Sequence, residues 1–334
     1  MRSSHIGLAL LLIVFAATNT AGREYETFDI VGDSISFGVN PECLLQYGWA
    51  QMLFGSSGCG QSAMTQTIYT LWPDIEAYNT AWPGSKASDW ADPNYTFTKT
   101  VLAHDPDLVV VWIGGNDGLD YAADGVYTEK ELGEYRTNLT TIIQILRSNA
   151  PPPEIIVCNY YDLFDGYSAN LPAGYEAYRA LSPATVTGNE MIRSVAESNG
   201  CFYVDIYTPL FHHAYGEEIG DTGHLSPDYF DTPLANLDIH PNTAGHQAVY
   251  QALYQTLQHL KNMPTLQSPH RPAEDVFTFE WSQGFGQTAV VERADTAGAP
   301  FVPIATNTGP PVTGFHTDSI DSVDRAFYRI KLSE

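Results

Sequence analysis

The strongest constraint on the fold is an alternation that runs from Glu24 to Lys261. Short apolar segments rich in β-formers alternate there with amphipathic helical patterns, which is typical of a parallel sheet with helices on its faces. The segment 108–113 reads LVVVWI without polar residues, and this predicts a central strand covered on both faces. The expected strands are Phe28–Val31, Glu76–Thr80, Leu108–Ile113, Glu154–Asn159 and Phe202–Ile206. The sequence therefore predicts one doubly wound α/β domain over residues 24–261, with a parallel five-stranded sheet.

Two helices can be placed by their ends and their apolar faces. Thr128 and Glu131 have the spacing of a capping box. One helical face then carries Leu132, Tyr135, Leu139, Ile142, Ile143 and Leu146. A second helix begins at about Thr243 and ends before Pro264. Its inward positions are Val249, Leu253, Leu257 and Leu260.

The pattern changes after Lys261. Residues 262–273 contain Pro264, Pro269 and Pro272, which predicts a linker without regular structure. Short β-like segments punctuated by Gly and Pro follow: Val276–Trp281, Thr288–Glu292, Phe301–Ala305 and Ala326–Lys331. We therefore expect a small, β-rich C-terminal domain over residues 274–334. A module of this size buries only a modest core.

The first 22 residues have the pattern of a signal peptide. Arg2 supplies a positive start, Ile6–Ala17 is apolar, and small residues follow. This predicts a secreted or periplasmic protein, with an uncleaved anchor as the alternative. The apolar run is too short to span a bilayer, and no later stretch has eighteen consecutive apolar residues, so we expect no integral membrane span in the mature chain.

Cysteine spacing and net charge limit the classes of function. Cys43, Cys59, Cys158 and Cys201 contain no C-x-x-C pair, which argues against zinc or thioredoxin-like chemistry. Export permits disulfides, and Cys43 and Cys59 flank a short Gly/Ser-rich loop, whereas the other two lie in apolar segments and fit buried free thiols. The connectivity stays open. Fifteen Lys and Arg against 39 Asp and Glu give a net charge of −24, which disfavours nucleic acid and anionic lipid as partners.

Four polar segments fall where the expected strands end or the last helix begins, at the edge where open parallel sheets bind ligands. Ser34 follows the first strand in Gly-Asp-Ser, Gly84 lies in Trp-Pro-Gly-Ser after the second, and Asn116 lies in Gly-Gly-Asn-Asp after the third. His240 precedes the last helix. Each alone also fits an ordinary N-cap, turn or surface residue. Together they predict a serine nucleophile, oxyanion donors and a base.

These segments resemble those of the SGNH hydrolases, also called GDSL-type esterases and lipases, over about Phe28 to Leu260. The resemblance implies a flavodoxin-like three-layer α/β/α sandwich. It implies that Ser34 is the nucleophile, that His240 is the general base, and that the N–H groups of Ser34 and Gly84 and the side chain of Asn116 form the oxyanion hole. The chemistry that these residues carry needs no metal and no organic cofactor.

One position departs from the family pattern. The family usually places its triad acid three residues before the histidine, where this chain has Leu237, and Asp238 stands two residues before His240. Two alternatives stay open. Either Asp238 still reaches the imidazole, or a backbone carbonyl near Asn236 or Leu237 orients it in a Ser-His dyad.

The competing interpretations come from several classes. No G-x-S-x-G nucleophile elbow is present, which argues against a different serine hydrolase fold. A metallohydrolase could use His212, His213 and His224, but their spacing fits no known ligand set and no H-E-x-x-H occurs. A catalytically silent, glycan-binding surface protein on the same fold is a further alternative.

The expected substrate is a small-molecule or polysaccharide ester with a short acyl group, acetyl among them. No amphipathic lid helix suited to a lipid surface is recognisable, although a lipase or lysophospholipase of the same family remains the alternative. The Tyr- and Pro-rich stretch from Tyr160 to Leu234 is expected to supply the walls of the site. The sequence does not indicate an oligomeric state.

Overall fold

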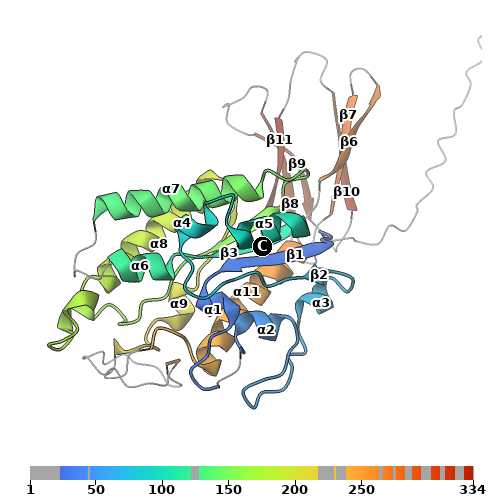
Figure 1. The fold of residues 1–334 in the computed structure, drawn as a ribbon. Coiled ribbons are helices and arrows are strands. Elements are labelled where there is room, and N and C mark those ends of the chain that lie inside the picture. The colour runs from blue at the N-terminus through green and yellow to red at the C-terminus, as the bar shows by residue number, and fades with distance from the viewer. Residues whose placement is uncertain are drawn as a thin grey trace, which may run out of the picture. The chain divides into compact units, whose positions relative to one another are not determined.

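A parallel five-stranded sheet lies at the centre of the larger unit in the computed structural model of this chain (Figure 1). Its strands are β1 (Thr27–Gly32), β2 (Glu76–Ala77), β3 (Leu108–Trp112), β4 (Glu154–Cys158) and β5 (Phe202–Val204). They are ordered β2-β1-β3-β4-β5, and every neighbouring pair is parallel. This order is that of flavodoxin-like folds. The predicted sheet is confirmed, with β2 and β5 shorter than expected.

The structure describes residues 23–43, 46–121, 128–216, 229–230 and 238–262, followed by six strands nearer the C-terminus. The predicted signal peptide, residues 1–22, lies outside the described residues. Within the described part, no helix combines the length and the apolar character needed to cross a membrane.

Helices cover both faces of the sheet (Figure 1). Their bounds are α1 Ser34–Phe37, α2 Trp49–Leu53, α3 Ile68–Leu71, α4 Ala87–Trp90, α5 Thr96–His104, α6 Gly115–Tyr121, α7 Glu129–Leu146, α8 Leu181–Ser198, α9 Tyr207–Leu210 and α11 Thr243–Asn262. Two short 3-10 helices span Ser168–Asn170 and Glu176–Tyr178. Figure 1 shows α4, α5, α7 and α8 on one face, and α2 and α11 on the other.

The central strand β3 is buried on both faces, as its unbroken apolar sequence predicts. Val109 and Val111 belong to a buried cluster with residues of α7 and α8. Because side chains alternate along a strand, Val110 and Trp112 face the opposite layer. There the ring of Trp112 lies 6.1 Å from that of Trp49 on α2. The sheet is therefore the middle of three layers, which is the predicted architecture.

Both helices placed from the sequence are present. The capping box holds the start of α7, where the Thr128 side chain accepts the Glu131 N–H and the Glu131 carboxylate accepts the Thr128 N–H. All six residues expected on its apolar face are buried. In α11, the four expected inward residues are fully buried. Helix α8 was not predicted, because Ser, Thr, Pro and Gly in its first half obscure the helical pattern.

The chain from Leu260 onward belongs to a second unit, which the structure separates from Tyr25–His259. Its strands are β6 Leu266–Ala273, β7 Val276–Ser282, β8 Thr288–Ala294, β9 Val302–Thr308, β10 Thr313–Ser319 and β11 Phe327–Ser333. They form two antiparallel three-stranded sheets, ordered β10-β7-β6 and β11-β8-β9. Four of these strands were predicted, whereas β6 and β10 were not.

The predicted linker is wrong over residues 266–273, which form β6. The strand pairs with β7 at Leu266, Gln267, His270 and Ala273, and its register shifts between Gln267 and His270 and again between His270 and Ala273. Pro269 and Pro272 fall within these two shifts. Because β6 lies at a sheet edge, the missing N–H of each proline is tolerated there.

The cysteines divide as the loop spacing suggests. Cys43 and Cys59 form a disulfide. Cys158 is a buried free thiol on β4. Cys201 is also free but only half-buried, with its sulfur 3.5 Å from the Arg147 guanidinium, so the expectation that it is buried is wrong.

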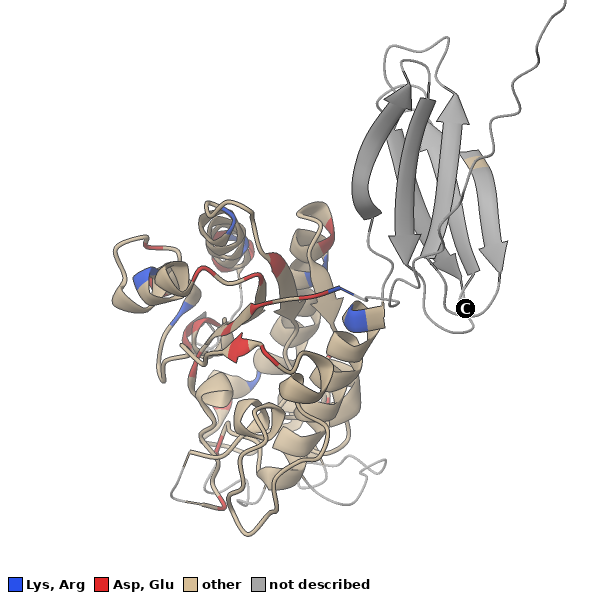
Figure 2. Cartoon of the chain, turned by 90° about the vertical axis from the view of Figure 1, so that its right-hand side faces the viewer, with Lys and Arg blue, Asp and Glu red and all other residues tan. Residues whose placement is uncertain are grey.

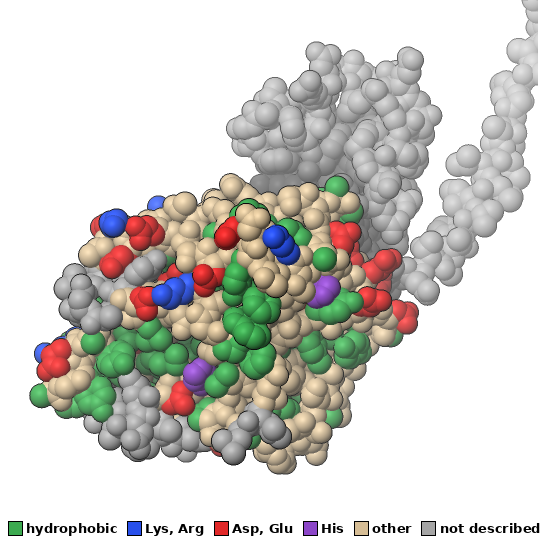
Figure 3. Space-filling view, viewed as in Figure 1, with side chains coloured by type: hydrophobic (Ala, Val, Ile, Leu, Met, Phe, Trp, Pro, Cys, Tyr) green, Lys and Arg blue, Asp and Glu red, His purple; other side chains and the backbone are tan. Residues whose placement is uncertain are grey.

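Charged and apolar side chains are unevenly distributed on the surface. In Figure 2, Asp and Glu positions outnumber those of Lys and Arg in the described part, in line with 39 acidic against 15 basic residues. On the face shown in Figure 3, a band of hydrophobic side chains lies beside a row of acidic and basic ones. An exposed apolar area bordered by polar residues is a candidate binding surface.

Candidate active site

Ser34 lies at the turn between β1 and α1. Asp33 caps the helix, because its carboxylate accepts the Ile35 N–H at 3.0 Å. Only glycine fits at position 32, since a Cβ there would lie 2.5 Å from the Ser36 hydroxyl and 2.9 Å from the Trp112 carbonyl. The hydroxyl of Ser34 is thus held at the carboxyl end of β1. This strand lies between β2 and β3, where the strand order reverses and open α/β sheets bind ligands.

The imidazole of His240 lies against this hydroxyl. Its Nε2 is 2.9 Å from Ser34 Oγ, although the two residues are 206 positions apart in the chain. Ser34 is 8% exposed, and the His240 side chain is 19% exposed. The two groups that the sequence proposed as nucleophile and base are therefore in hydrogen-bonding contact in a largely buried site.

Asp238 contacts the other side of the imidazole. Its Oδ1 lies 2.7 Å from His240 Nδ1 and also accepts the His240 backbone N–H at 3.0 Å. An aspartate commonly accepts the N–H two residues ahead, and this turn carries its carboxylate toward the following side chain. The described residues therefore show the carboxylate alternative, while Asn236 and Leu237 lie outside them.

Two tyrosines hold this histidine loop. The Tyr215 hydroxyl accepts the Asp238 N–H at 3.0 Å and donates to the Asp238 carbonyl at 2.9 Å. The Tyr161 hydroxyl donates to the Ile239 carbonyl at 2.5 Å. The sequence placed Tyr161 and Tyr215 only within a stretch expected to line the site. Nothing in their local pattern indicates that their hydroxyls bind the backbone of a loop far along the chain.

Asn116 lies in the first turn of α6, beside the turn that carries Gly84. One Nδ2 hydrogen of Asn116 is donated to the Ser85 carbonyl at 2.9 Å, which fixes the plane of an amide that has two such hydrogens. The Ser85 hydroxyl donates to the Gly32 carbonyl at 3.1 Å and ties this turn to the end of β1. Gly84 is exposed in the left-handed region, with φ +79°, and does not line the cavity described next.

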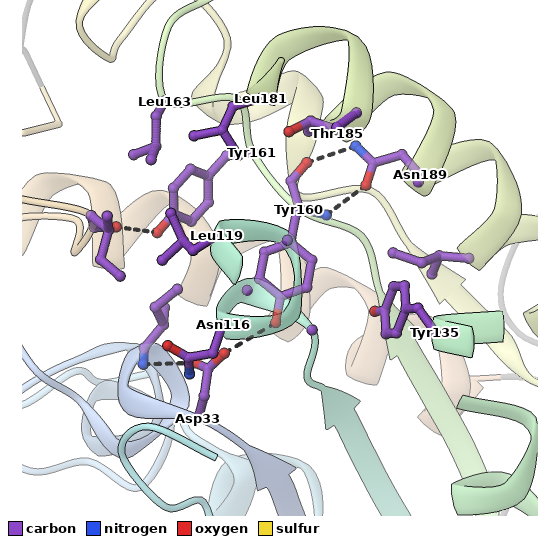
Figure 4. Close-up of a pocket in the computed structure, with 18 of the residues that line it drawn as sticks. Asp33, Asn116, Leu119, Tyr135, Tyr160, Tyr161, Leu163, Leu181, Thr185 and Asn189 are labelled. Atoms are coloured by element: carbon purple, nitrogen blue, oxygen red, sulfur yellow. Dashed lines mark hydrogen bonds between the residues drawn. The ribbon is translucent and has the colours of Figure 1, made fainter. Parts of the chain in front are cut away.

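A cavity of about 100 Å³ borders Ser34 (Figure 4). Ser34, Asn116 and Ile239 line it on the side of the nucleophile. Its apolar walls come from α6, α8 and the chain after β4, and they include Leu119, Leu163, Leu181, Ala184 and Ile192. The expectation that the stretch beginning at Tyr160 supplies walls of the site agrees with this lining as far as the described residues extend.

The polar groups of the cavity wall are bonded to one another. The Tyr160 hydroxyl donates to Asp33 at 3.2 Å, and the Asn189 amide bonds to both the carbonyl and the N–H of Tyr160 (Figure 4). The Tyr135 hydroxyl donates to the Ile113 carbonyl at 2.6 Å. Because these bonds are made within the wall, the lining presents mainly hydrocarbon to a ligand.

Burial sets the protonation of groups near the nucleophile. Burial, together with the nearby negative charge of Asp117, raises the pKa of Asp33 to about 6, against the hydrogen bonds that Asp33 accepts. Burial also raises the pKa of Asp117 to about 6. The second histidine of the region, His246, is different: burial lowers its pKa to about 4, so it is neutral near pH 7. Its Nε2 lies 2.9 Å from the Val39 carbonyl, which assigns it a structural role.

Of the histidines considered for a metallohydrolase, His212 and His213 are described, and neither belongs to a metal site there. Within the described part, no group of three His, Cys, Asp or Glu is placed to hold a metal ion. The ring of His213 stacks on Tyr229, with centroids 4.0 Å apart. His224 lies outside the described residues.

The model of the GDSL-like lipase/acylhydrolase family matches residues 30–248, which is well over half of the chain. None of the curated proteins matches it. Solved structures that resemble it include an acetyl xylan esterase, AlAXEase, at 18% identity and a TM-score of 0.48, over 69% of this chain and 98% of that one.

Two further structures are similar to the same degree. Axe2, an acetylxylan esterase from Geobacillus stearothermophilus, is 18% identical with a TM-score of 0.46, over 72% of this chain and 96% of its own. LAE5, an alpha/beta hydrolase enzyme from the metagenome of Lake Arreo, Spain, is 20% identical with a TM-score of 0.46, over 70% of this chain and 96% of its own. At such identities and scores, these likenesses carry no argument about the substrate of this chain.

Proposed function

Because the chain belongs to the GDSL-like lipase/acylhydrolase family and is a hydrolase of carboxylic esters, we propose that Ser34 is its nucleophile, His240 its general base and Asp238 the carboxylate that orients the base. The observation that carries this proposal is the continuous contact from Asp238 Oδ1 through the imidazole to Ser34 Oγ, at 2.7 Å and 2.9 Å. These distances are those expected of a nucleophile, its base and the group that orients the base.

The first half of the reaction forms an acyl-enzyme. A serine hydroxyl is a weak nucleophile, so His240 Nε2 takes the proton while Ser34 Oγ forms a bond to the acyl carbon. The carbonyl electron pair moves onto oxygen, and the Asp238 carboxylate stabilises the imidazolium that results. When the carbonyl re-forms, the bond to the alcohol oxygen breaks, and His240 gives its proton to the departing alkoxide.

The second half repeats these steps with water as the nucleophile and releases the acid. In both halves, negative charge on the carbonyl oxygen needs donors. We assign these to the N–H groups of Ser34 and Gly84 and to the amide of Asn116. The Asn116–Ser85 bond supports this assignment, because it orients the amide before substrate binds. Loss of one such donor typically costs about 10²- to 10³-fold in turnover.

The acyl group is short. The cavity beside Ser34 has a volume of about 100 Å³, whereas a cavity of about 150 Å³ accepts benzene, with its six carbon atoms. An acyl group of fewer than about six heavy atoms therefore fits, and acetyl fits easily. A lipase or lysophospholipase activity would require the acyl chain to extend beyond this cavity.

The protein is exported to the outside of the cell or to the periplasm. The signal-like pattern of residues 1–22 supports this location. The disulfide between Cys43 and Cys59 supports it independently, because such bonds persist mainly in oxidising compartments.

The test is hydrolysis of p-nitrophenyl esters from acetate to palmitate by wild type and Ser34→Ala. We expect the highest kcat/KM at the short end, and a loss of roughly 10⁴-fold or more in the variant. Ser56→Ala, which changes an exposed loop serine, serves as the matched control and should retain wild-type activity.

A fluorophosphonate should label Ser34 of the wild type, as located by mass spectrometry. Label on another residue would contradict the assigned nucleophile. Highest activity on palmitate would contradict the short acyl group.

A further inference from the structure

Trp82 is an exposed aromatic side chain beside the proposed site. It is one of three large hydrophobic side chains that stay exposed among the described residues between 23 and 262, and 47% of its surface is accessible. The others are Tyr69 and Val186, at 39% and 47%. Transfer of a large aromatic ring out of water lowers the free energy. The exposed ring of Trp82 is therefore available to bind a ligand.

Aromatic neighbours hold this ring. It stacks on Phe97 with centroids 4.5 Å apart and planes 22° apart, and it meets Phe37 edge-on at 6.4 Å. Phe97 contacts Tyr95 at 5.4 Å and the buried Trp90 at 6.4 Å. The indole is therefore fixed from one side, so a ligand that stacks on it pays little to order the ring.

The backbone places Trp82 next to the nucleophile. The Trp82 N–H donates to the Gly32 carbonyl at 2.9 Å, two residues before Ser34. Phe37 ends α1, the helix that begins at Ser34. Trp82 also opens the turn that contains Gly84, and this turn lies outside the acyl cavity. Trp82 thus lies near Ser34 along the backbone of two neighbouring strand ends, and outside the acyl cavity.

A polar groove begins at Lys86, the residue that follows this turn. It has a volume of about 590 Å³, and its lining includes Lys86, Ser88, Asp117 and Asp120. Lys86 follows Ser85, the residue whose carbonyl holds Asn116, and Asp117 follows Asn116. The groove offers both donors and acceptors of hydrogen bonds. In Figure 3, acidic and basic side chains lie in a row beside the hydrophobic band.

We propose that Trp82, supported by Phe37 and Phe97, is a stacking subsite for a pyranose ring in the alcohol part of the substrate, so that the ester is an acylated neutral carbohydrate. This inference rests on the proposed function. A pyranose ring has an apolar C–H face that suits the negative face of an indole, and hydroxyl groups at its rim that suit the groove.

The surface fits a sugar better than a lipid bilayer. A membrane-docking surface needs a continuous apolar area of a few hundred Å² or more. Among residues 23–262 as far as they are described, the other two exposed large hydrophobic side chains lie on α3 and α8, and charged side chains lie beside the hydrophobic band of Figure 3. A net charge of −24 also repels anionic headgroups.

The test compares two acetate esters, acetylated cellotriose and ethyl acetate, because ethanol has no ring to stack. In Trp82→Ala, the ratio of kcat/KM for acetylated cellotriose to that for ethyl acetate should fall about 3- to 10-fold, mainly through KM. Trp82→Phe, which keeps an aromatic face, should show a smaller fall. Tyr69→Ala removes an exposed aromatic ring from α3 and should leave both rates unchanged.

Unmodified cellotriose provides a second measurement. It should inhibit ethyl acetate hydrolysis competitively in the wild type, and about 3- to 10-fold more weakly in Trp82→Ala. An unchanged ratio and unchanged inhibition would overturn the proposal. The proposal would also be overturned if the wild type sedimented with phosphatidylcholine vesicles and Trp82→Ala did not, because Trp82 would then bind lipid.

The two proposals can fail separately. A wild type that hydrolyses neither ester would contradict the proposed function. Calorimetric binding of cellotriose to wild type and Trp82→Ala would then decide the subsite: weaker binding to the variant supports it, and no binding to either protein overturns it.

Discussion

Asp238 reaches the imidazole of His240 although it stands only two residues before it, because the backbone turns between them. A single carboxylate oxygen accepts both the backbone N–H and the ring Nδ1–H of His240. The short turn thus replaces the extra residue of the usual family spacing. Because Tyr215 holds both backbone groups of Asp238, the turn is fixed independently of the imidazole.

We expect Asp238→Asn to lower kcat about 10³- to 10⁴-fold with little change in KM. The amide cannot stabilise the imidazolium, and it favours the tautomer with the proton on Nε2, which then cannot accept the proton of Ser34. Hydrolysis of p-nitrophenyl acetate measures the effect. Asp74→Asn, at an exposed carboxylate, is the control. Activity of Asp238→Asn within tenfold of wild type would show that another group orients the base.

The helices around the site differ in how clearly the sequence predicts them. The capping box predicts the start of α7, and the spacing of its apolar residues predicts its inner face. Helix α8 supplies much of the cavity wall through Leu181, Ala184 and Ile192, yet its polar first half conceals it. The wall of the acyl cavity was therefore not predictable in detail, because it depends on how α8 packs against α6 and α7.

Thr128→Ala should destabilise α7 without altering catalysis. Loss of this N-cap costs about 1 kcal/mol, which for a unit of this size lowers Tm by about 2–4 °C. Thermal unfolding and p-nitrophenyl acetate hydrolysis measure the two effects. Thr137→Ala, at an exposed site within the same helix, should not lower Tm. An unchanged Tm in Thr128→Ala would show that tertiary packing alone fixes the start of α7.

At the scale of the whole molecule, buried carboxyls make stability depend on pH. The pKa values of Asp33, Asp117 and Asp165 are raised from 3.8 to about 6, chiefly by burial. Between these values the folded chain binds more protons than the unfolded chain. The free energy of unfolding therefore falls as the pH rises through this window. His246 acts oppositely, because its pKa is lowered from 6.5 to about 4, but three carboxyls outweigh one imidazole.

We therefore expect a lower Tm at about pH 7 than at about pH 5. Calorimetry in about 1 M NaCl, where the screening length is about 3 Å, separates this effect from general repulsion among surface carboxylates. Asp33→Asn removes one of the titrating groups, so its Tm should change less over the same interval. A wild-type Tm that rises from pH 5 to pH 7 would contradict the assigned pKa shifts.

The fold follows from local patterns to a large extent. Strand positions in the sheet, the start of α7 and the apolar faces of α7 and α11 are set by residues a few positions apart, which the sequence displays directly. The predicted linker failed for a long-range reason. Pro269 and Pro272 discourage a strand locally, but an edge strand with register shifts accommodates them once β7 lies beside it.

The sequence by itself determined the order of the sheet-forming segments, the polar residues at their carboxyl ends and the residue types that suit acyl transfer. Only the tertiary structure decided that Ser34 and His240 meet across 206 positions, that the carboxylate of Asp238 faces the ring, and that Trp82 stays exposed beside them. The physical reason is that hydrogen bonding and packing between distant segments depend on the closed three-layer fold. Local sequence patterns do not determine which distant side chains come into contact when the fold closes.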